Sequence, residues 1–298
     1  MANNSQDMET LSVDILILGG GGAGLFCALH ACRKDPKLKI ALAAKGLIGQ
    51  SGCTRMVQGG YNAVLNPRDS LEKHFEDTIR GGGFINDQEL AWSLVSDAPR
   101  IIAELERMGC YFDRTPDGDI YQKPFAGQSF DRTVHRGDLT GIEIMTRLKE
   151  QLLAIGVMRL DEHRALELLT DGSGVVGALL LDVPRGRFVA VSARATVLAT
   201  GGGARMYKIA APSLEKAGDG MAMCYRAGCA MRDMEMYQFH PTGLVAGQSI
   251  VTGAVLEEGL RGAGGRMYNG LGERFMARYD QERMERSTRD VVARASYI

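Results

Sequence analysis

Short apolar runs alternate with glycine-rich and helix-forming segments in the first part of the chain. Residues 13–18 (VDILIL) are β-branched and almost wholly apolar, which is typical of a strand buried on both faces of a parallel sheet. The glycine-rich segment 19–24 (GGGGAG) follows, and residues 25–34 are predicted to form a helix. A second apolar run at 39–44 completes the pattern, so the sequence predicts a βαβ unit near the start of the chain.

Later segments extend this alternation of helices and strands. Apolar residues at 71, 75 and 79 predict a helix over 69–80. Residues 87–108 are predicted to form a helix in two pieces, because Pro99 suits a new helix start after Asp97. The other predicted elements are a helix from 140 to about 155, a hairpin of strands 174–183 and 188–193, a buried strand at 195–200 and a helix from about 281 onward. Together they predict an α/β fold with a parallel sheet and a hairpin insertion.

Composition narrows the possible functions. The chain has 298 residues, a length that fits one large domain or two ordinary ones. Its 35 basic and 36 acidic residues nearly cancel, which leaves no electrostatic footprint for nucleic acid. Aromatic residues make up only 6%, so a stacking platform for single strands is not expected either. The 38 glycines are clustered, which indicates loops that approach a ligand closely.

Neither a metal site nor a membrane span is predicted. None of the six cysteines forms a C-x-x-C pair or another zinc or iron–sulfur ligand set, so we expect scattered thiols in a reducing compartment. Residues 1–12 lack the basic and apolar regions of a secretory signal. The most apolar stretch, 13–32, is interrupted by Asp14 and five glycines, which is unsuitable for crossing a bilayer.

The first motif with chemical meaning is Gly19-x-Gly21-x-x-Gly24, placed between a predicted strand and a predicted helix. In such a motif the first glycine makes the tight turn and the second lets the backbone touch a pyrophosphate. The third glycine lets the helix pack on the strand, and the helix N-terminus offers free N–H groups to the anion. The sequence therefore predicts a dinucleotide site.

The identity of the dinucleotide depends on the end of the second strand. The acid that usually binds the ribose is absent there, because the chain has Ala44 and Lys45. Lys45 fits either an NADP site, where it would meet the 2′-phosphate, or an FAD family that uses lysine at this position. The strand 195–200, which enters Gly201-Gly-Gly203 after a hairpin insertion, is similar to the FAD domains of many flavoproteins and favours FAD.

Several motifs in order resemble the fumarate reductase and succinate dehydrogenase flavoprotein family, which includes L-aspartate oxidase. They are Gln50-Ser-Gly-Cys-Thr54, Gln58-Gly-Gly60, Asp138-x-Thr140-Gly141, Gly218-Asp219-Gly220, His240-Pro-Thr-Gly243, Glu258-Gly-x-Arg261-Gly and Arg289-Asp290-Val-Val. The resemblance implies a doubly wound, Rossmann-like FAD-binding domain over 1–238 and the beginning of an α+β capping domain over 239–298. It covers only the N-terminal half of a family member, so we expect a fragment, or a chain that another polypeptide completes.

The resemblance also implies which residues contact FAD. The expected cofactor residues are Gly19, Gly21, Gly22, Ala23, Gly24, Lys45, Ser51, Gly52, Thr54, Gln58, Gly59, Gly60, Ala165, Ala199, Thr200, Gly201 and Asp219. Cys53 stands where membrane-bound family members link FAD covalently to a histidine. We therefore expect FAD to be bound noncovalently.

The same resemblance implies a substrate site for a small dicarboxylate. His240 matches the histidine that holds a substrate carboxylate, and Thr242 belongs to the same motif. Arg289 matches the proton donor, while Glu258 and Arg261 match the residues that resupply its proton. The expected reaction is the interconversion of fumarate and succinate, with hydride transfer at flavin N5.

Three further positions qualify this expectation. Glu257 stands where the family usually has a threonine or serine that binds a substrate carboxylate, and Ala263 replaces a common acid. A carboxylate at 257 would repel a dianion unless its side chain points away. Phe125, in Pro124-Phe-Ala-Gly127, is typical of fumarate reductases, whereas aspartate oxidases place a glutamate there for the substrate ammonium.

L-aspartate oxidase and a non-catalytic FAD-binding fragment are the alternative functions. The family usually pairs with an iron–sulfur subunit, so such a partner is expected. The resemblance implies a cytoplasmic location, at the inner face of the membrane where partner subunits hold the chain there.

Overall fold

The structure, a computed structural model, describes residues 8–298. The prediction of no secretory signal rests partly on residues 1–7, which lie outside the described residues. The chain divides into two compact units. The first unit consists of the segment ending at Met56 together with Ile144–Glu235, and the second of Val57–Glu143 and Met236–Ile298.

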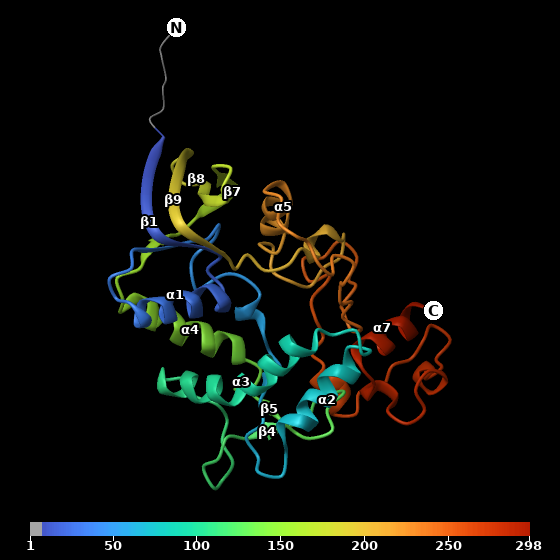
Figure 1. Cartoon of the computed structure of the whole chain (residues 1–298). Coiled ribbons are helices and arrows are strands. Elements are labelled where there is room, and N and C mark those ends of the chain that lie inside the picture. The colour runs from blue at the N-terminus through green and yellow to red at the C-terminus, as the bar shows by residue number, and fades with distance from the viewer. Residues whose placement is uncertain (1–7) are drawn as a thin grey trace. The chain divides into compact units, whose positions relative to one another are not determined.

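The first unit is built on a six-stranded sheet in the order β6-β2-β1-β9-β8-β7 (Figure 1). Its four parallel strands are β6 (Met158–Leu160), β2 (Ile40–Ala43), β1 (Glu9–Leu18) and β9 (Arg187–Leu198). The strands β8 (Val175–Asp182) and β7 (His163–Thr170) extend the sheet in antiparallel fashion. The predicted α/β fold with a hairpin insertion is confirmed.

Burial explains why these segments form the centre of the sheet. Leu16, Ile17 and Leu18 are buried at the end of β1, and all four residues of β2 are buried. The helix α1 (Gly22–Lys34) connects the two strands and packs on both through Leu25 and Leu29. Removal of such large aliphatic side chains from water contributes roughly 2 kcal/mol each.

The hairpin β8–β9 is fixed by a buried carboxylate at its turn. Asp182 is fully buried, and its Oδ2 accepts hydrogen bonds from Arg185 and Arg187 at 3.1 Å each. The separate strands predicted at 188–193 and 195–200 are one strand, β9. The prediction of a break was wrong because β9 pairs with β1 along almost its whole length.

The second unit contains a helical pair and a small antiparallel sheet. Helix α2 (Leu71–Gly81) packs on α3 (Gln88–Arg107), where Phe75 and Trp92 meet edge to face with ring centroids 5.6 Å apart. The small sheet has the order β3 (Tyr61–Asn62), β5 (Thr133–Val134) and β4 (Gln122–Lys123). Helix α4 (Thr140–Leu153) follows the small sheet in the chain, and from Ile144 onward it belongs to the first unit.

Helix α3 is continuous, so the break predicted at Pro99 was wrong. The side chain of Asp87 caps its start by accepting a hydrogen bond from the Leu90 N–H at 3.1 Å. Buried Val95 and Ile102 lie on either side of the proline. This packing stabilises the helix despite the backbone hydrogen bond that proline removes.

The end of the chain is more irregular than predicted. It contains the short helix α6 (Gly259–Gly262), single helical turns at Phe275–Arg278 and Met284–Arg286, and α7 (Arg289–Tyr297). The helix predicted from about residue 281 therefore begins at Arg289. Met284 has a φ of +53°, a conformation that a continuing helix does not allow. Phe275, Met276, Val292 and Ala295 form a small core between these segments.

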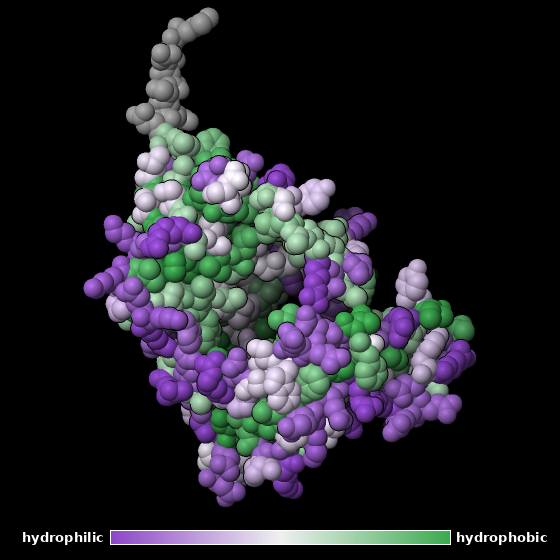
Figure 2. Space-filling model, in the orientation of Figure 1, coloured by the Kyte–Doolittle hydropathy of each residue, from purple (hydrophilic) through white to green (hydrophobic). Residues whose placement is uncertain are grey.

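The unit boundary at residue 235 lies close to the domain boundary predicted at 238, whereas residues 57–143 group with the C-terminal segment. The assignment of FAD-binding and capping domains stays a prediction. Hydrophilic and apolar side chains are interspersed on the face that Figure 2 shows. Over the described part of the chain, no helix is both long and apolar enough for a membrane span.

Candidate functional site

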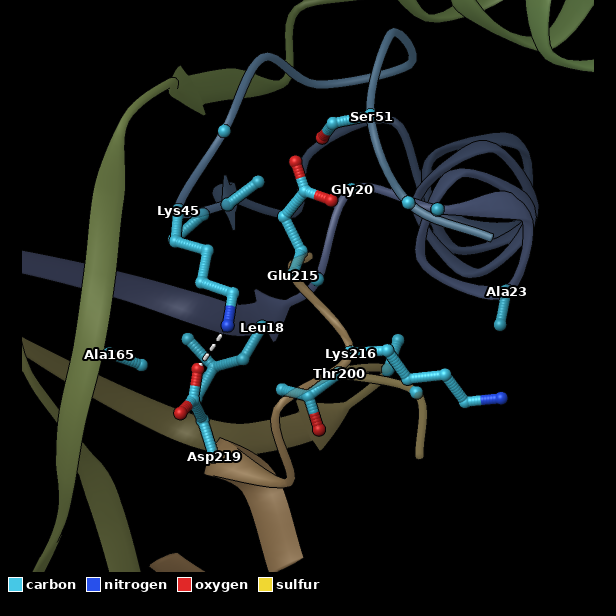
Figure 3. A pocket seen from close by; sticks show the side chains of 18 of the residues that line it. Leu18, Gly20, Ala23, Lys45, Ser51, Ala165, Thr200, Glu215, Lys216 and Asp219 are labelled. Carbon is cyan, nitrogen blue, oxygen red and sulfur yellow. Dashed lines mark hydrogen bonds and ion pairs between the residues drawn. The ribbon is translucent and has the colours of Figure 1, made fainter. Parts of the chain in front are cut away.

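A cavity of about 450 Å³ lies in the first unit, where β1, β2 and β9 end (Figure 3). Leu18, Ala43 and Leu198 at the ends of these strands form part of its lining. Ligands of open α/β sheets bind at the carboxyl ends of the strands, so this cavity has the expected position of a dinucleotide site.

Two glycines of the first motif are required by close backbone contacts. Gly19 has a φ of +119°, and a Cβ atom there would lie 2.2 Å from the carbonyl oxygen of Ala199, which directly follows β9. A Cβ atom on Gly24 would lie 1.9 Å from the Gly19 carbonyl oxygen. Any side chain at either position would force the loop, the helix and the strand apart.

The N-terminus of α1 faces the cavity and leaves room for an anion. Gly21 is the N-cap residue and has no side-chain cap, while the Gly22 N–H donates to Thr54 Oγ1 at 3.2 Å. A Cβ atom on Gly21 would lie 3.7 Å from Thr54 Oγ1 and would meet no other atom within 4 Å beyond the neighbouring residues. Open space beside N–H groups and a positive helix end fits the pyrophosphate of FAD.

A charged cluster lies at another part of the cavity. Lys45 donates to Asp219 Oδ2, and Arg164 lies 3.3 Å from Asp219 Oδ1. Burial acts to raise the pKa of Asp219, but the hydrogen bond and charge of Lys45, together with Arg164, hold it below its ordinary value. Asp219 is the first residue of α5 (Asp219–Arg226), so its carboxylate also faces the positive end of that helix.

Most of the expected cofactor residues surround this cavity. Those in its lining are Gly19, Gly21, Gly22, Ala23, Lys45, Ser51, Gly52, Thr54, Ala165, Ala199, Thr200, Gly201 and Asp219. Gly24 lies behind the lining, where it packs α1 against the loop. Gln58, Gly59 and Gly60 belong to the second unit, where a Cβ atom on Gly59 would lie 2.7 Å from the Phe125 ring.

Sequence reasoning did not find Glu215 and Lys216. Both line the cavity, and both are half-buried. Figure 3 shows the Glu215 carboxylate near Ser51, while the Lys216 side chain extends toward Ala23. The only nearby signal in the sequence was the motif Gly218-Asp219-Gly220 that follows them. Lys216 adds a positive charge on the side of the α1 N-terminus.

The expected proton-transfer residues form a connected cluster in the second unit. Arg289 Nε donates to Glu258 Oε2 at 2.6 Å, and Arg261 lies 3.7 Å from Glu258 Oε1. Glu258 and Arg261 are 6% and 4% exposed, whereas the Arg289 side chain is 36% exposed. A hydrogen bond from Arg261 Nη1 to the Glu285 carbonyl at 2.9 Å fixes the Arg261 side chain.

Arg289 faces a cavity of about 330 Å³ in the same unit. Phe125, Gln128, Gln238 and Glu258 also line it, and Arg289 donates to Gln238 Oε1 at 3.0 Å. His240 and Thr242 do not belong to its lining. Thr242 Oγ1 instead donates to the Leu256 carbonyl at 2.9 Å.

His240 is nevertheless close to the arginine cluster. Burial lowers the pKa of His240, and the positive charge of Arg289 lowers it further. The Thr242 N–H lies 3.3 Å from His240 Nδ1, which orients the ring. Burial also lowers the pKa of Arg261, with Glu258 opposing that effect. The cluster therefore places an imidazole with a lowered pKa near two guanidinium groups.

Glu257 turns toward its own backbone. Its Oε2 accepts a hydrogen bond from the Gly259 N–H at 2.6 Å, and Glu257 is absent from the lining of the cavity that Arg289 faces. Its Oε1 is buried without a hydrogen-bond partner among the described residues. The Glu257 carboxylate thus turns toward its own backbone, and its effect on a bound dianion stays a prediction.

Comparison with known proteins gives a consistent result. Residues 14–297 match the FAD binding domain family. The chain is 50% identical over 288 residues to an uncharacterized FAD-dependent oxidoreductase of Methanocaldococcus jannaschii, covering 96% of this chain and 52% of the relative. It is 44% identical over 294 residues to a CoM/CoB fumarate reductase polypeptide of Methanothermobacter marburgensis, covering 98% and 53%.

Solved structures agree with this relationship. The flavoprotein FrdA of E. coli quinol fumarate reductase superposes with a TM-score of 0.92 at 35% identity, covering 97% of this chain and 51% of FrdA. Sdh1 of Mycobacterium smegmatis superposes with a TM-score of 0.83 at 39% identity, covering 97% and 50%. The chain thus spans about half the length of its relatives.

The fold and the glycine-lined cavity define an FAD-binding domain. The chain belongs to the family of FAD-binding domains found in fumarate reductase and succinate dehydrogenase flavoproteins. FAD is the cofactor of this family, and the open space at the α1 N-terminus fits its pyrophosphate.

Proposed function

We propose that the chain is part of a flavoprotein that interconverts fumarate and succinate. The observation that carries this proposal is the connected series Arg289, Glu258 and Arg261, in which a half-buried guanidinium faces a cavity and two buried charges lie behind it. Relatives named as fumarate reductases support the choice of substrate.

The proposed cofactor residues would hold FAD noncovalently. FAD supplies hydride transfer at N5 when it is bound. The α1 N-terminus and Lys216 would neutralise the pyrophosphate, while Lys45 and Asp219 would position the other end of the dinucleotide. Cys53 lines the cavity in the place of a linking histidine, so we assign no covalent bond to the flavin.

Proton transfer would run through Arg289. Fumarate reduction needs a proton at one alkene carbon, and a guanidinium has a pKa above about 12, so its proton must be replaced quickly. Glu258 accepts the Arg289 Nε–H and lies between two arginines, which suits it to return a proton to Arg289. Arg261 would orient Glu258, and His240, whose pKa burial and Arg289 lower, would donate a hydrogen bond to a substrate carboxylate.

L-aspartate oxidase is the second candidate within this family. Its substrate carries an ammonium group that needs a nearby anion, because burying an unpaired charge is costly. Phe125 lines the cavity with Arg289 and offers no anion. This apolar ring favours a dicarboxylate without an amino group. A non-catalytic FAD-binding role is the third candidate, since the chain spans half of its relatives.

The partner and the location follow from the same proposal. An iron–sulfur subunit would carry electrons to or from FAD. The protein would then be cytoplasmic and held at the inner face of the membrane by partner subunits.

A substrate comparison tests the function. The purified protein, with FAD added, is assayed with a reduced dye and fumarate, with an oxidised dye and succinate, and with L-aspartate. We expect turnover of fumarate or succinate at least about tenfold above that of aspartate, a difference of about 1.4 kcal/mol in the barrier. Equal turnover of aspartate would support the oxidase. Flavin binding without turnover of any of these substrates would support the non-catalytic role.

A further inference from the structure

Cys224 and Cys229 lie on either side of the C-terminal end of α5, and the backbone brings them together. The Cys229 N–H donates to the Cys224 carbonyl at 3.0 Å, and the Gly228 N–H donates to the Tyr225 carbonyl at 3.1 Å. Gly228 has a φ of +77°. These two bonds around a left-handed glycine define a Schellman turn, in which the first and last side chains characteristically touch.

The positions of the two thiols suit a disulfide. A disulfide needs Cα atoms within about 7 Å and Cβ atoms that face each other. The direct N–H to C=O bond between the two residues holds their backbones within this reach. Burial raises the pKa of the Cys224 thiol, and the neighbouring Cys229 raises it further through its charge and a hydrogen bond. The two thiol groups are therefore neighbours in the reduced protein.

A second pair of cysteines provides an internal comparison. Cys27 and Cys32 have the same spacing of five residues, but both lie within the continuous helix α1. Five positions along a helix place two side chains about 140° apart around its axis. Cys27 and Cys32 therefore point in different directions, so sequence spacing alone does not create the contact at 224 and 229.

We propose that Cys224 and Cys229 are a site of reversible thiol–disulfide exchange with low-molecular-weight disulfides. Cys229 is exposed, so its thiolate attacks one sulfur of the small disulfide, releasing one small thiolate and forming a mixed disulfide. The Cys224 thiolate then attacks the Cys229 sulfur and releases the second small thiolate. The two cysteine protons pass through solvent to the released thiolates, so the protein dithiol is oxidised and the small disulfide is reduced.

The proposed site lies on the helix that contributes to the FAD cavity. Met223, which lines the cavity, directly precedes Cys224 in α5. Asp219 begins the same helix and pairs with Lys45. Oxidation would therefore tie down one end of a helix whose other end holds part of the proposed cofactor site.

Peptide mapping tests this proposal directly. The folded protein is incubated with oxidised glutathione, its free thiols are blocked with iodoacetamide, and it is digested with trypsin without reduction. Trypsin cleaves after Arg226, between the two cysteines, so a disulfide would hold peptides 217–226 and 227–232 together. We expect this joined pair in the wild-type digest and its separation after a reductant is added. Cys27 and Cys32 should remain alkylated.

Two serine variants separate the steps. Cys224→Ser should trap glutathione on Cys229, because the second attack cannot occur. Cys229→Ser should leave Cys224 largely unmodified, because its thiol is half-buried and has a raised pKa. A glutathione adduct that persists on Cys229 in the wild type, or two alkylated cysteines at 224 and 229, would overturn the proposal. Equal bridging of Cys27 and Cys32 would show that the turn is not the cause.

Discussion

Arg289 donates its Nε proton to Glu258 across 2.6 Å, and the pair joins a buried carboxylate to a guanidinium that faces a cavity. Glu258 is 6% exposed, so the two arginines rather than water compensate its carboxylate group. Loss of either arginine would leave a buried carboxylate without full compensation, which is costly. This dependence makes the pair a direct subject for mutation.

Arg289→Lys tests the proposed proton donor. Lysine keeps the positive charge but lacks the planar group that bonds Glu258 and Gln238 together. We expect kcat and kcat/KM for fumarate to fall together by about 100-fold or more, with flavin content unchanged. Arg294→Lys, on an exposed residue of the same helix, is the matched control and should retain activity. A raised KM with normal kcat would mean that Arg289 only binds substrate.

Glu258→Gln should have a weaker effect than Arg289→Lys. The amide keeps the size of the side chain but cannot carry a proton back to Arg289, so resupply slows while the donor remains. Steady-state kcat should therefore fall more than the single-turnover rate, because Arg289 begins the first turnover with its proton in place. A single-turnover rate that falls as far as kcat would argue against a role for Glu258 in resupply.

Denaturation should release FAD from the protein as an unmodified molecule. Cys53 stands at the position of the linking histidine, and glycine backbone and the Lys45–Asp219 ion pair line the cavity where FAD would bind. Acid precipitation should place all flavin in the supernatant with the mass of free FAD. Fluorescent flavin that migrates with the denatured polypeptide on a gel would contradict this expectation.

Gly24→Ala tests the cradle. The added Cβ atom would lie 1.9 Å from the Gly19 carbonyl oxygen, so the glycine loop must shift away from its position. We expect FAD affinity, measured by flavin fluorescence titration, to fall at least about tenfold, which corresponds to about 1.4 kcal/mol. Gly156→Ala is the control, because a Cβ atom there meets nothing within 4 Å. Equal affinity of both variants would show that the loop tolerates the side chain.

Glu285 makes stability depend on pH. Hydrogen bonds from Arg274, and then from the Met267 N–H, lower the pKa of this buried carboxyl from 4.5 to about 2. Because the folded state has the lower pKa, the stabilisation is fully present above pH 4.5 and is lost as the pH falls toward 2. Removal of the Glu285 carboxylate should therefore lower the free energy of unfolding most near neutral pH.

Glu285→Gln measures this contribution. We expect the free energy of unfolding in urea at pH 7 to fall by about 2 to 3 kcal/mol, with the difference from wild type shrinking as the pH is lowered from about 4.5 toward about 2.5. Glu273→Gln, at an exposed pair with Arg278, should leave stability nearly unchanged. A difference for Glu285→Gln that stays constant with pH would rule out the ionised carboxylate as its source.

Local sequence was sufficient where one short segment determines the geometry. The glycine motif predicted the strand, turn and helix around Gly19 and Gly24, because close backbone contacts there exclude any side chain. The buried runs of β1 and β2 were equally informative, since both faces of these strands are covered. Lys45 and Asp219, 174 positions apart, were each identified by motif, but only the structure places them in one ion pair.

Features that depend on distant packing were not predictable in this way. Pro99 has a strong local preference for a helix start, and neighbouring buried side chains override it. Glu215 and Lys216 belong to no motif, so only the path of the preceding loop places them at the cavity. The grouping of 57–143 with 236–298 likewise depends on contacts that no local pattern encodes.

The pairing of β1 with β9 has a consequence for how the protein folds. Register partners such as Leu18 and Leu198 are 180 positions apart, so the central pair of the sheet joins two distant parts of the chain. Contacts of such long range slow folding, because loop closure must precede any gain in stability. During synthesis, the apolar side chains of β1 would remain exposed, and the glycine loop unpacked, until β9 emerged from the ribosome. The cofactor cradle is therefore a late product of folding, because Gly19 is made well before Ala199, the residue that its backbone contacts.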